Sequence, residues 1–374
     1  MELGMQTFFD MAWNMDGFDF EKVNSHQATI LTRLFPQLSK FHTSIFKILD
    51  DYYRLAWSRK PEFMGFECQW DDKEHTGLKP TDYSFQHYDE AQLRLADYQR
   101  ISNEVERLAS MMDEEWAPAF YELLQFSVQG AFQMNRKFLM AQLNHELAAQ
   151  LDAEGANWAA RQSALAYDSI QTLNNRYNCQ CDGKWHAMMM LPTGWCSLYQ
   201  TMPPVTLNPY EGEGVPAILS SPRRTLLPHI LDLTTPTEMS DGIRIIHGIG
   251  RDWKVIQLLS PTDNVFDVAS SQSPHVSYTF STAGCDSVCV LLSVVPTWPL
   301  FKGRGNKLGI AIDGGKPQLA DNLFTEYSRH WKDQVMRNET TLRLRLPLEA
   351  GKTNHTVTLF TGDPGVMIQR IAIE

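Results

Sequence analysis

The sequence is poor in cysteine, in positive charge and in long hydrophobic runs, and each shortage excludes a class of protein. Six cysteines in 374 residues are too few for a disulfide-stapled scaffold. The close pairs Cys179/Cys181 and Cys285/Cys289 do not form the repeated CxxC pattern of a structural zinc site. A formal net charge of −11 disfavours a nucleic-acid partner. Because no stretch approaches the ~20 apolar residues of a membrane span, we expect no membrane partner either.

The first nine residues also lack the basic start and the long apolar core of a secretory signal peptide. Taken as a complete chain, the sequence would be cytoplasmic, whereas a piece of a secreted enzyme would be extracellular or periplasmic. Hydrophobic residues at 43% and charged residues at 21% are typical of a folded protein. The length of 374 residues predicts two domains.

Helical periodicity dominates the first half. Apolar residues recur at the spacing of amphipathic helices from Ile45 to about Leu173. The predicted helices cover residues 45–56, 95–112, 117–150 and 157–173. Because each has an apolar face to bury, we expect an antiparallel helical bundle over residues 36–190.

The preceding residues 1–35 have no clean helical period. Their aromatic residues crowd together without a regular spacing: Phe8, Phe9, Trp13, Phe18 and Phe20. Apolar patches of more than a few hundred Å² usually mark a partner surface. We therefore predict that this segment mediates either self-association or binding to an upstream polypeptide.

The second half shows the pattern of short strands. Residues 191–240 are rich in proline and glycine, which excludes helix and most central strands, so we predict a connector packed on the surface. Val, Ile, Thr and aromatic residues then gather in eight short runs. These runs are 244–247, 254–258, 275–280, 287–294, 308–312, 341–346, 355–360 and 366–373. Such spacing, almost without helical pattern, predicts an antiparallel β-sandwich over residues 241–374.

A catalytic centre is not evident. A glycosidase needs two carboxyl groups facing each other roughly 5 to 10 Å apart, whereas the acidic pairs here are adjacent in sequence and are better interpreted as solvated surface. These pairs are Asp50-Asp51, Asp71-Asp72 and Glu114-Glu115. A G-x-S-x-G elbow and an HExxH zinc motif are absent. We therefore predict no catalytic residue, no cofactor and no metal.

Four residues are candidates for ligand binding, each with a structural alternative. Arg59 and Lys60 end the first predicted helix, where Pro61 stops the helix and cations favour the carbonyl end of its dipole. Trp185, beside Lys184, could stack on a sugar ring or could fill the space between the bundle and the next domain.

Several phrases of the sequence occur in the order found in one enzyme family. They are YYRL at 52–55, RKPE at 59–62, EAQLRLADY at 90–98, AFYELL at 119–124, MNRKFL at 134–139, RYN at 176–178, GKW at 183–185, VPTWP at 295–299, AID at 311–313 and DPGVMIQRI at 363–371. Their collinear order resembles the region downstream of the catalytic barrel in glycoside hydrolase family 115, the xylan α-1,2-glucuronidases. The chain departs from the pattern with Leu93 for an arginine and His186 for an asparagine.

The resemblance implies a C-terminal half made of the helical region and the β-sandwich. It also implies that residues 1–35 are the lead-in from a missing barrel domain. In the family, the catalytic carboxylates belong to an N-terminal α/β domain and a TIM-type barrel, which have no counterpart here. The chain is thus expected to help a barrel domain or an upstream polypeptide remove (4-O-methyl)glucuronic acid from glucuronoxylan, and to be inactive alone. The alternatives are a structural or carbohydrate-binding module that holds glycan through Trp298 and Trp331, or a degenerate remnant.

Overall fold

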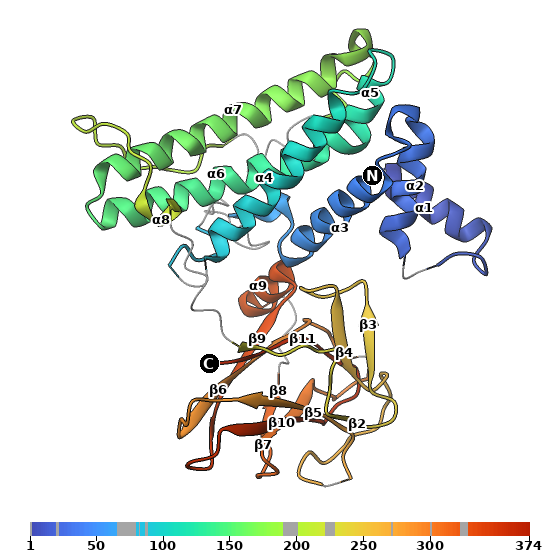
Figure 1. The fold of residues 1–374 in the computed structure, drawn as a ribbon, viewed down its shortest axis with the longest axis vertical. Coiled ribbons are helices and arrows are strands. Elements are labelled where there is room, and N and C mark those ends of the chain that lie inside the picture. Colours follow the sequence, from blue (N-terminus) through green and yellow to red (C-terminus); the bar gives the residue numbers. More distant parts are fainter. Residues whose placement is uncertain are drawn as a thin grey trace. The chain divides into compact units, whose positions relative to one another are not determined.

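A computed structural model describes residues 2–19, 22–65, 80–81, 83–86, 89–189, 201–220, 229–270, 272–299, 301–321 and 328–374. The chain divides into two compact units. The first comprises Met1–Ala56 and Lys60–Leu226, and the second comprises Trp57–Arg59 and Leu227–Glu374 (Figure 1). Helices fill the first unit and antiparallel sheets fill the second, which confirms the predicted fold class of α followed by β.

The first unit contains eight labelled α-helices among its described residues. They are α1 (Glu2–Trp13), α2 (Val23–Leu34), α3 (His42–Ser58), α4 (Glu90–Ala109), α5 (Ala117–Phe120), α6 (Phe126–Ala149), α7 (Ala153–Gly183) and α8 (Ala217–Ser220). A π-helical segment, Tyr121–Gln125, joins α5 to α6, so the third predicted helix is continuous but not uniform. None of the described helices is long and apolar enough to cross a lipid bilayer.

Amphipathic spacing explains why α3 forms and which face it buries. Ile45, Ile48 and Leu49 from the predicted stripe are buried, together with Leu55. The helix ends at Ser58, and a short 3₁₀ turn then starts at Pro61, whose ring fixes φ and removes an N–H donor. The α3 stripe packs in one apolar core with residues of α2 and α4.

Helices α6 and α7 form an antiparallel pair, which Figure 1 shows side by side. Ser163 Oγ donates to the carbonyl of Lys137 at 2.7 Å, and Asn144 Nδ2 donates to the carbonyl of Ala156 at 2.7 Å. The earlier residue of α6 therefore contacts the later residue of α7, and the later residue of α6 contacts the earlier one of α7. This is the arrangement of an antiparallel hairpin. Asp152 begins α7 as its N-cap, because its Oδ1 accepts from the Gly155 N–H at 2.9 Å.

Residues 1–35 differ from the expectation. The sequence showed no clean helical period there, yet α1 and α2 occupy most of the segment. The period is obscured because Phe8, Phe9 and Trp13 of α1 are exposed, at 56%, 59% and 92%, while Leu3 is buried. Phe20 lies outside the described residues.

The second unit is a sandwich of two antiparallel sheets. Its strands are β1 (His229–Ile230), β2 (Glu238–Met239), β3 (Arg244–His247), β4 (Lys254–Leu258), β5 (His275–Ser281), β6 (Ser287–Val294), β7 (Lys307–Ile312), β8 (Gln318–Asp321), β9 (Thr340–Pro347), β10 (Asn354–Thr361) and β11 (Val366–Ile373). One sheet has the order β3-β4-β11-β6-β9 with β1 also on β11, and the other has the order β2-β5-β10-β7-β8. A single apolar cluster contains buried residues from both sheets.

All eight predicted strands are present, and the structure adds elements that the sequence did not indicate. The strands β1, β2 and β8 are short, and α9 (Arg329–Arg337) separates β8 from β9. Ser328 begins this helix by accepting from the Trp331 N–H at 3.2 Å. Trp331 therefore lies on a helix and is only partly exposed, whereas the carbohydrate-binding alternative expects an exposed aromatic at this position.

Candidate ligand-binding site

Three loops of the sandwich gather at one of its ends. β4 and β6 both pair antiparallel with β11, so both end where β11 begins. β10 pairs antiparallel with β7, which brings Thr361 at the end of β10 opposite Leu308 near the start of β7. The described parts of three loops therefore meet at the same end of the sandwich, although they are far apart in sequence: 259–270 with 272–274, 295–299 with 301–306, and 362–365.

Backbone hydrogen bonds fix these loops against one another. The Gly365 N–H donates to the carbonyls of Leu258 and Leu259, both at 3.1 Å, and the Val295 N–H donates to the carbonyl of Met367 at 2.8 Å. On the other side, the Asp363 N–H donates to the carbonyl of Lys307 at 2.8 Å. The loops are thus held to strand ends by their own polar groups, as buried backbone requires.

A glycine permits the closest approach of two loops. Gly365 has φ of 99°, a region that side chains strongly disfavour. A Cβ at this position would lie 3.0 Å from Cγ of Pro261. A larger residue would therefore push the loop 362–365 away from the loop after β4.

A pocket of about 380 Å³ opens among these loops. Two exposed aromatic side chains line it, Trp298 at 45% and Phe301 at 39%. Polar side chains also line it: Gln257, Asn264, Arg304, Asn306 and Asp363. An apolar surface with a few fixed polar groups is the usual composition of a small-molecule site.

The polar groups of the pocket are held in place. Asn306 Nδ2 donates to the carbonyl of Thr297 at 2.7 Å, which fixes the chain next to Trp298. Asp363, only 5% exposed, accepts the Lys307 N–H on Oδ2 at 2.9 Å. Arg304 Nη2 donates to the carbonyl of Asp263, and no carboxylate among the described residues forms an ion pair with it.

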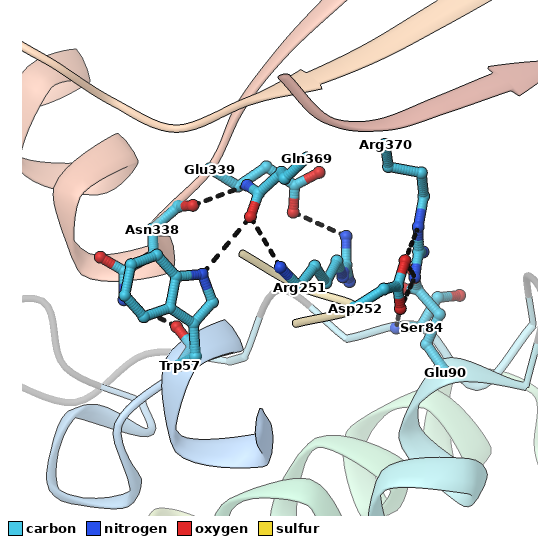
Figure 2. A network of polar contacts seen from close by, with 9 residues as sticks. All are labelled: Trp57, Ser84, Glu90, Arg251, Asp252, Asn338, Glu339, Gln369 and Arg370. Carbon is cyan, nitrogen blue, oxygen red and sulfur yellow. Dashed lines mark hydrogen bonds and ion pairs between the residues drawn. The ribbon is translucent and has the colours of Figure 1, made fainter. Parts of the chain in front are cut away.

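A second polar cluster lies in the same unit and has a structural role. Gln369 is 1% exposed, and its Oε1 accepts from the Arg251 N–H at 2.9 Å and from Trp57 Nε1 at 3.4 Å (Figure 2). Its Nε2 donates to the carbonyl of Asn338 at 2.8 Å, and Arg251 Nη1 binds Glu339 Oε2 at 2.6 Å. Gln369 thus uses both ends of its amide inside the protein, so this cluster offers stability rather than a ligand site.

The predicted ligand residues near Pro61 lie in different surroundings. Arg59 is 6% exposed and clusters with the second unit. Lys60 clusters with the first unit and is exposed, with its Nζ 5.9 Å from the centroid of the Phe63 ring. Burial of Arg59 favours the structural alternative for that residue.

The other predicted pair, Lys184 and Trp185, follows the end of α7. Lys184 is exposed, its Nζ lies 4.9 Å from the Trp185 ring centroid, and Trp185 is partly buried. Just before them, Asn178 Oδ1 accepts from the Met189 N–H at 3.0 Å, and its Nδ2 donates to the Met189 carbonyl at 2.9 Å. Within the described chain no contact joins Lys60 to Lys184 or Trp185, so these residues do not form one site.

The acidic pairs differ in their surroundings. Asp51 accepts hydrogen bonds from Arg54 and Arg100, both at 2.8 Å. Burial works to raise the pKa of Asp51, but these two guanidinium groups outweigh it and the pKa is lowered. Glu114 and Glu115 are exposed, and Asp71-Asp72 lies outside the described residues. In the described parts of the chain, no three His, Cys, Asp or Glu side chains are grouped to hold a metal.

One buried cation was not identified from the sequence. Lys137 on α6 is 0% exposed, and burial lowers its pKa to about 7. Its Nζ donates to the carbonyl of Thr201 at 3.3 Å. No local pattern marks Lys137 as buried, although it falls inside the long apolar stretch of the third predicted helix.

Comparison with known proteins finds one family model, which matches within the second unit, and a solved structure that is similar along nearly the whole chain. Residues 234–374 match the family model described as the glycosyl hydrolase family 115 C-terminal domain. The chain is similar to a solved family 115 4-O-methyl-α-glucuronidase with specificity for decorated arabinogalactans, at 26% identity and a TM-score of 0.75, over 98% of this chain and 43% of that chain. The chain thus spans less than half the length of this relative.

Weaker matches are found among carbohydrate-binding modules. A family 35 module from Clostridium thermocellum has 11% identity and a TM-score of 0.27, over 36% of this chain and 90% of that chain. A module from Cellvibrio mixtus lichenase 5A, in complex with cellotriose, has 13% identity and a TM-score of 0.27, over 40% of this chain and 97% of that chain. No curated protein matches the sequence.

Proposed function

We propose, on the premise that this chain has a C-terminal part of the glycoside hydrolase family 115 fold, that it works as a non-catalytic region of an α-glucuronidase-like enzyme. The resemblance to family 115 predicted from the sequence is confirmed by the family model over residues 234–374 and by the solved relative. The observation that carries the proposal is the match over 98% of this chain, because it includes the helical unit as well as the sandwich.

The reaction that the chain would support is the removal of (4-O-methyl)glucuronic acid side chains from a polysaccharide. The solved relative is a 4-O-methyl-α-glucuronidase with specificity for decorated arabinogalactans, whereas the sequence resemblance implied xylan. The side chain is the same type of sugar in both cases. The experiment therefore compares two polysaccharides that carry this side chain.

A hybrid enzyme tests this function. The part of the solved relative that this chain matches would be replaced by the 374 residues, and release of 4-O-methylglucuronic acid would be measured on glucuronoxylan and on decorated arabinogalactan. The control is the relative truncated at the same junction. We expect the hybrid to release the acid and the truncated protein to release little. A folded hybrid with no more activity than the truncated control would contradict the proposal.

A second candidate function, carbohydrate binding by the sandwich, is favoured by one observation. Trp298 is 45% exposed and lines the pocket at the loop end, where a planar indole can stack on a sugar ring. A non-catalytic region and a binding module are compatible, since a site that holds the polysaccharide would raise its local concentration at a catalytic domain.

The four residues selected from the sequence remain predicted ligand contacts. Lys60 and Lys184 are exposed and can reach a ligand, and Trp185 is partly exposed beside Lys184. Arg59 is the weakest of the four because it is 6% exposed. Their contribution would be read from the hybrid enzyme carrying Lys184→Gln or Trp185→Ala.

A further inference from the structure

We infer that the pocket at the loop end of the second unit binds a carboxylate-bearing pyranose, a hexuronic acid residue of a glycan. The inference rests on the proposed function, because a region that supports release of glucuronic acid side chains works on polymers that carry this sugar. It goes further by assigning a site, an orientation and a role to three residues of the sandwich. These residues are Trp298, Arg304 and Asp363.

The size and shape of the pocket suit one or two sugar rings. Its volume of about 380 Å³ lies at the lower end of the ~300–1,000 Å³ range of small-molecule sites. Its walls come from three loops that backbone hydrogen bonds attach to the strand ends. A pocket built on a rigid sandwich needs little ordering when a ligand enters, which reduces the entropic cost of binding.

The aromatic side chains give the pocket an apolar surface. Trp298 and Phe301 are among the exposed large hydrophobic residues, yet both line one concave site. The C–H face of a pyranose is apolar, whereas its edge carries hydroxyl groups. An aromatic side chain with one open face can therefore cover the sugar while the hydroxyl groups reach the polar residues around it.

Arg304 supplies the selectivity for acid. Among the described residues that line the pocket it is the one cation, and the carbonyl of Asp263 accepts a hydrogen bond from one of its amino groups. Among the described residues, no carboxylate forms an ion pair with it. The remaining donors of a planar guanidinium match the two oxygens of a carboxylate, with which they form paired hydrogen bonds.

Asp363 determines which way the sugar lies. Its Oδ2 accepts the Lys307 N–H at 2.9 Å, and its side chain lines the pocket although it is only 5% exposed. A ligand carboxylate would be repelled by this group, whereas a sugar hydroxyl can donate to it. We therefore place the ligand carboxylate at Arg304 and a ring hydroxyl at Asp363.

The test compares an acidic oligosaccharide with its neutral counterpart. The full chain would be titrated by calorimetry with xylotriose bearing 4-O-methylglucuronic acid, with unsubstituted xylotriose, and with free glucuronic acid. We expect the acidic trisaccharide derivative to bind at least tenfold more tightly than xylotriose. Free glucuronic acid should also bind, because it carries the carboxylate that Arg304 selects.

Variants locate the site. Arg304→Gln should weaken binding of the acidic oligosaccharide at least tenfold and leave xylotriose unchanged, whereas Trp298→Ala should weaken both ligands. Lys302→Gln is the matched control, because Lys302 is exposed in the same loop and does not line the pocket. Arg304→Lys, which keeps the charge but loses the paired geometry, should fall between wild type and Arg304→Gln. Thermal unfolding confirms that each variant is folded.

The outcomes separate this inference from the proposed function. Equal affinity for the acidic and neutral ligands, or an Arg304→Gln protein that binds like wild type, would overturn the acid-specific site and leave the hybrid-enzyme result unaffected. No measurable binding of any of the three sugars would overturn it as well. Conversely, acid-specific binding together with an inactive hybrid would retain the site and remove the proposed function.

Discussion

Asn144 on α6 pairs with both backbone polar groups of Thr206: its Nδ2 donates to the Thr206 carbonyl at 2.7 Å and its Oδ1 accepts from the Thr206 N–H at 2.7 Å. Asn157 on α7 pairs with Asn208 in the same way, at 2.8 Å and 2.9 Å. Together the two amides fix residues 201–214 along α6 and α7, in a segment with little regular structure of its own.

The first prediction concerns this attachment. Asn144 is 0% exposed, so Asn144→Ala leaves the N–H and the carbonyl of Thr206 without partners, and we expect a loss of about 1–3 kcal/mol. Hydrogen exchange in residues 201–214 should accelerate while exchange in the sandwich stays unchanged. Asn103→Ala, at an exposed position of α4, is the control. Unchanged exchange in Asn144→Ala would show that other contacts hold the segment.

The second prediction concerns the buried Lys137. Burial lowers its pKa to about 7, whereas a lysine in an unfolded chain keeps its proton to about pH 10.4. Between these values the unfolded state binds more protons than the folded state, so the free energy of unfolding rises with pH, by at most about 1.4 kcal/mol per pH unit.

Urea unfolding followed by helical circular dichroism at pH 7.5, 8.5 and 9.5 measures this slope. Lys137→Met should remove the rise and should be most stabilising, relative to wild type, at the lowest pH. Lys47→Met, at an exposed position of α3, should leave the slope intact. A wild-type protein whose stability is flat across this range would contradict the prediction.

The third prediction concerns Asp313 in the turn after β7. Burial works to raise the pKa of this carboxyl, but hydrogen bonds from His355, from the Thr356 N–H and from Lys352 outweigh it and lower the pKa. His355 Nδ1 lies 2.7 Å from Asp313 Oδ2, and its own side chain is 0% exposed. The carboxylate therefore stabilises the sandwich at neutral pH, and this stability is lost as the pH falls through its lowered pKa.

Asp313→Asn is the matched variant, because asparagine tolerates the positive φ of 50° at this position. Calorimetric unfolding should show the variant less stable than wild type at pH 7, with the difference shrinking as the pH falls below about 4. A difference that is the same at pH 7 and at pH 3 would show that the charge of Asp313 is not responsible.

The fourth prediction concerns the exposed apolar side chains of α1. Met5, Phe8, Phe9 and Trp13 are exposed at 52%, 56%, 59% and 92%, and such clusters mark partner surfaces. We expect the chain to self-associate through this helix, or to bind the catalytic part of the enzyme. Light scattering on wild type and on Phe8→Ser/Trp13→Ser should show a larger mean mass for wild type. Monomers of equal stability in both samples would exclude self-association through α1.

The strands were predictable because their local pattern and their burial agree. β10 alternates exposed or partly exposed with buried residues along its whole length, which is the pattern of a strand that packs one face on a core. β1 and β2 have only two residues each, and their pairing depends on β11 and β5 rather than on their own sequence. Helix α1 was not predicted because its pattern and its burial disagree: its aromatic side chains are exposed rather than buried.

The pocket could be predicted only in part. From the sequence, Trp298 is expected to be an exposed aromatic that holds glycan, and it does line the pocket. Arg304 and Asp363 are 59 positions apart in the numbering and meet only because β10, β7 and β11 bring their loops to one end of the sandwich. Nothing in the local sequence around either residue contains that information.

The most direct test of the account is the release of glucuronic acid by the purified chain itself. Product chromatography would follow glucuronoxylan and aldouronic oligosaccharides incubated with the 374-residue protein. We predict no release above the level of a heat-denatured control, because the proposed function gives this chain a non-catalytic role and, in the family that it resembles, the catalytic carboxylates belong to other domains. Enzyme-dependent release that is abolished by replacing acidic residues within this chain would contradict the account.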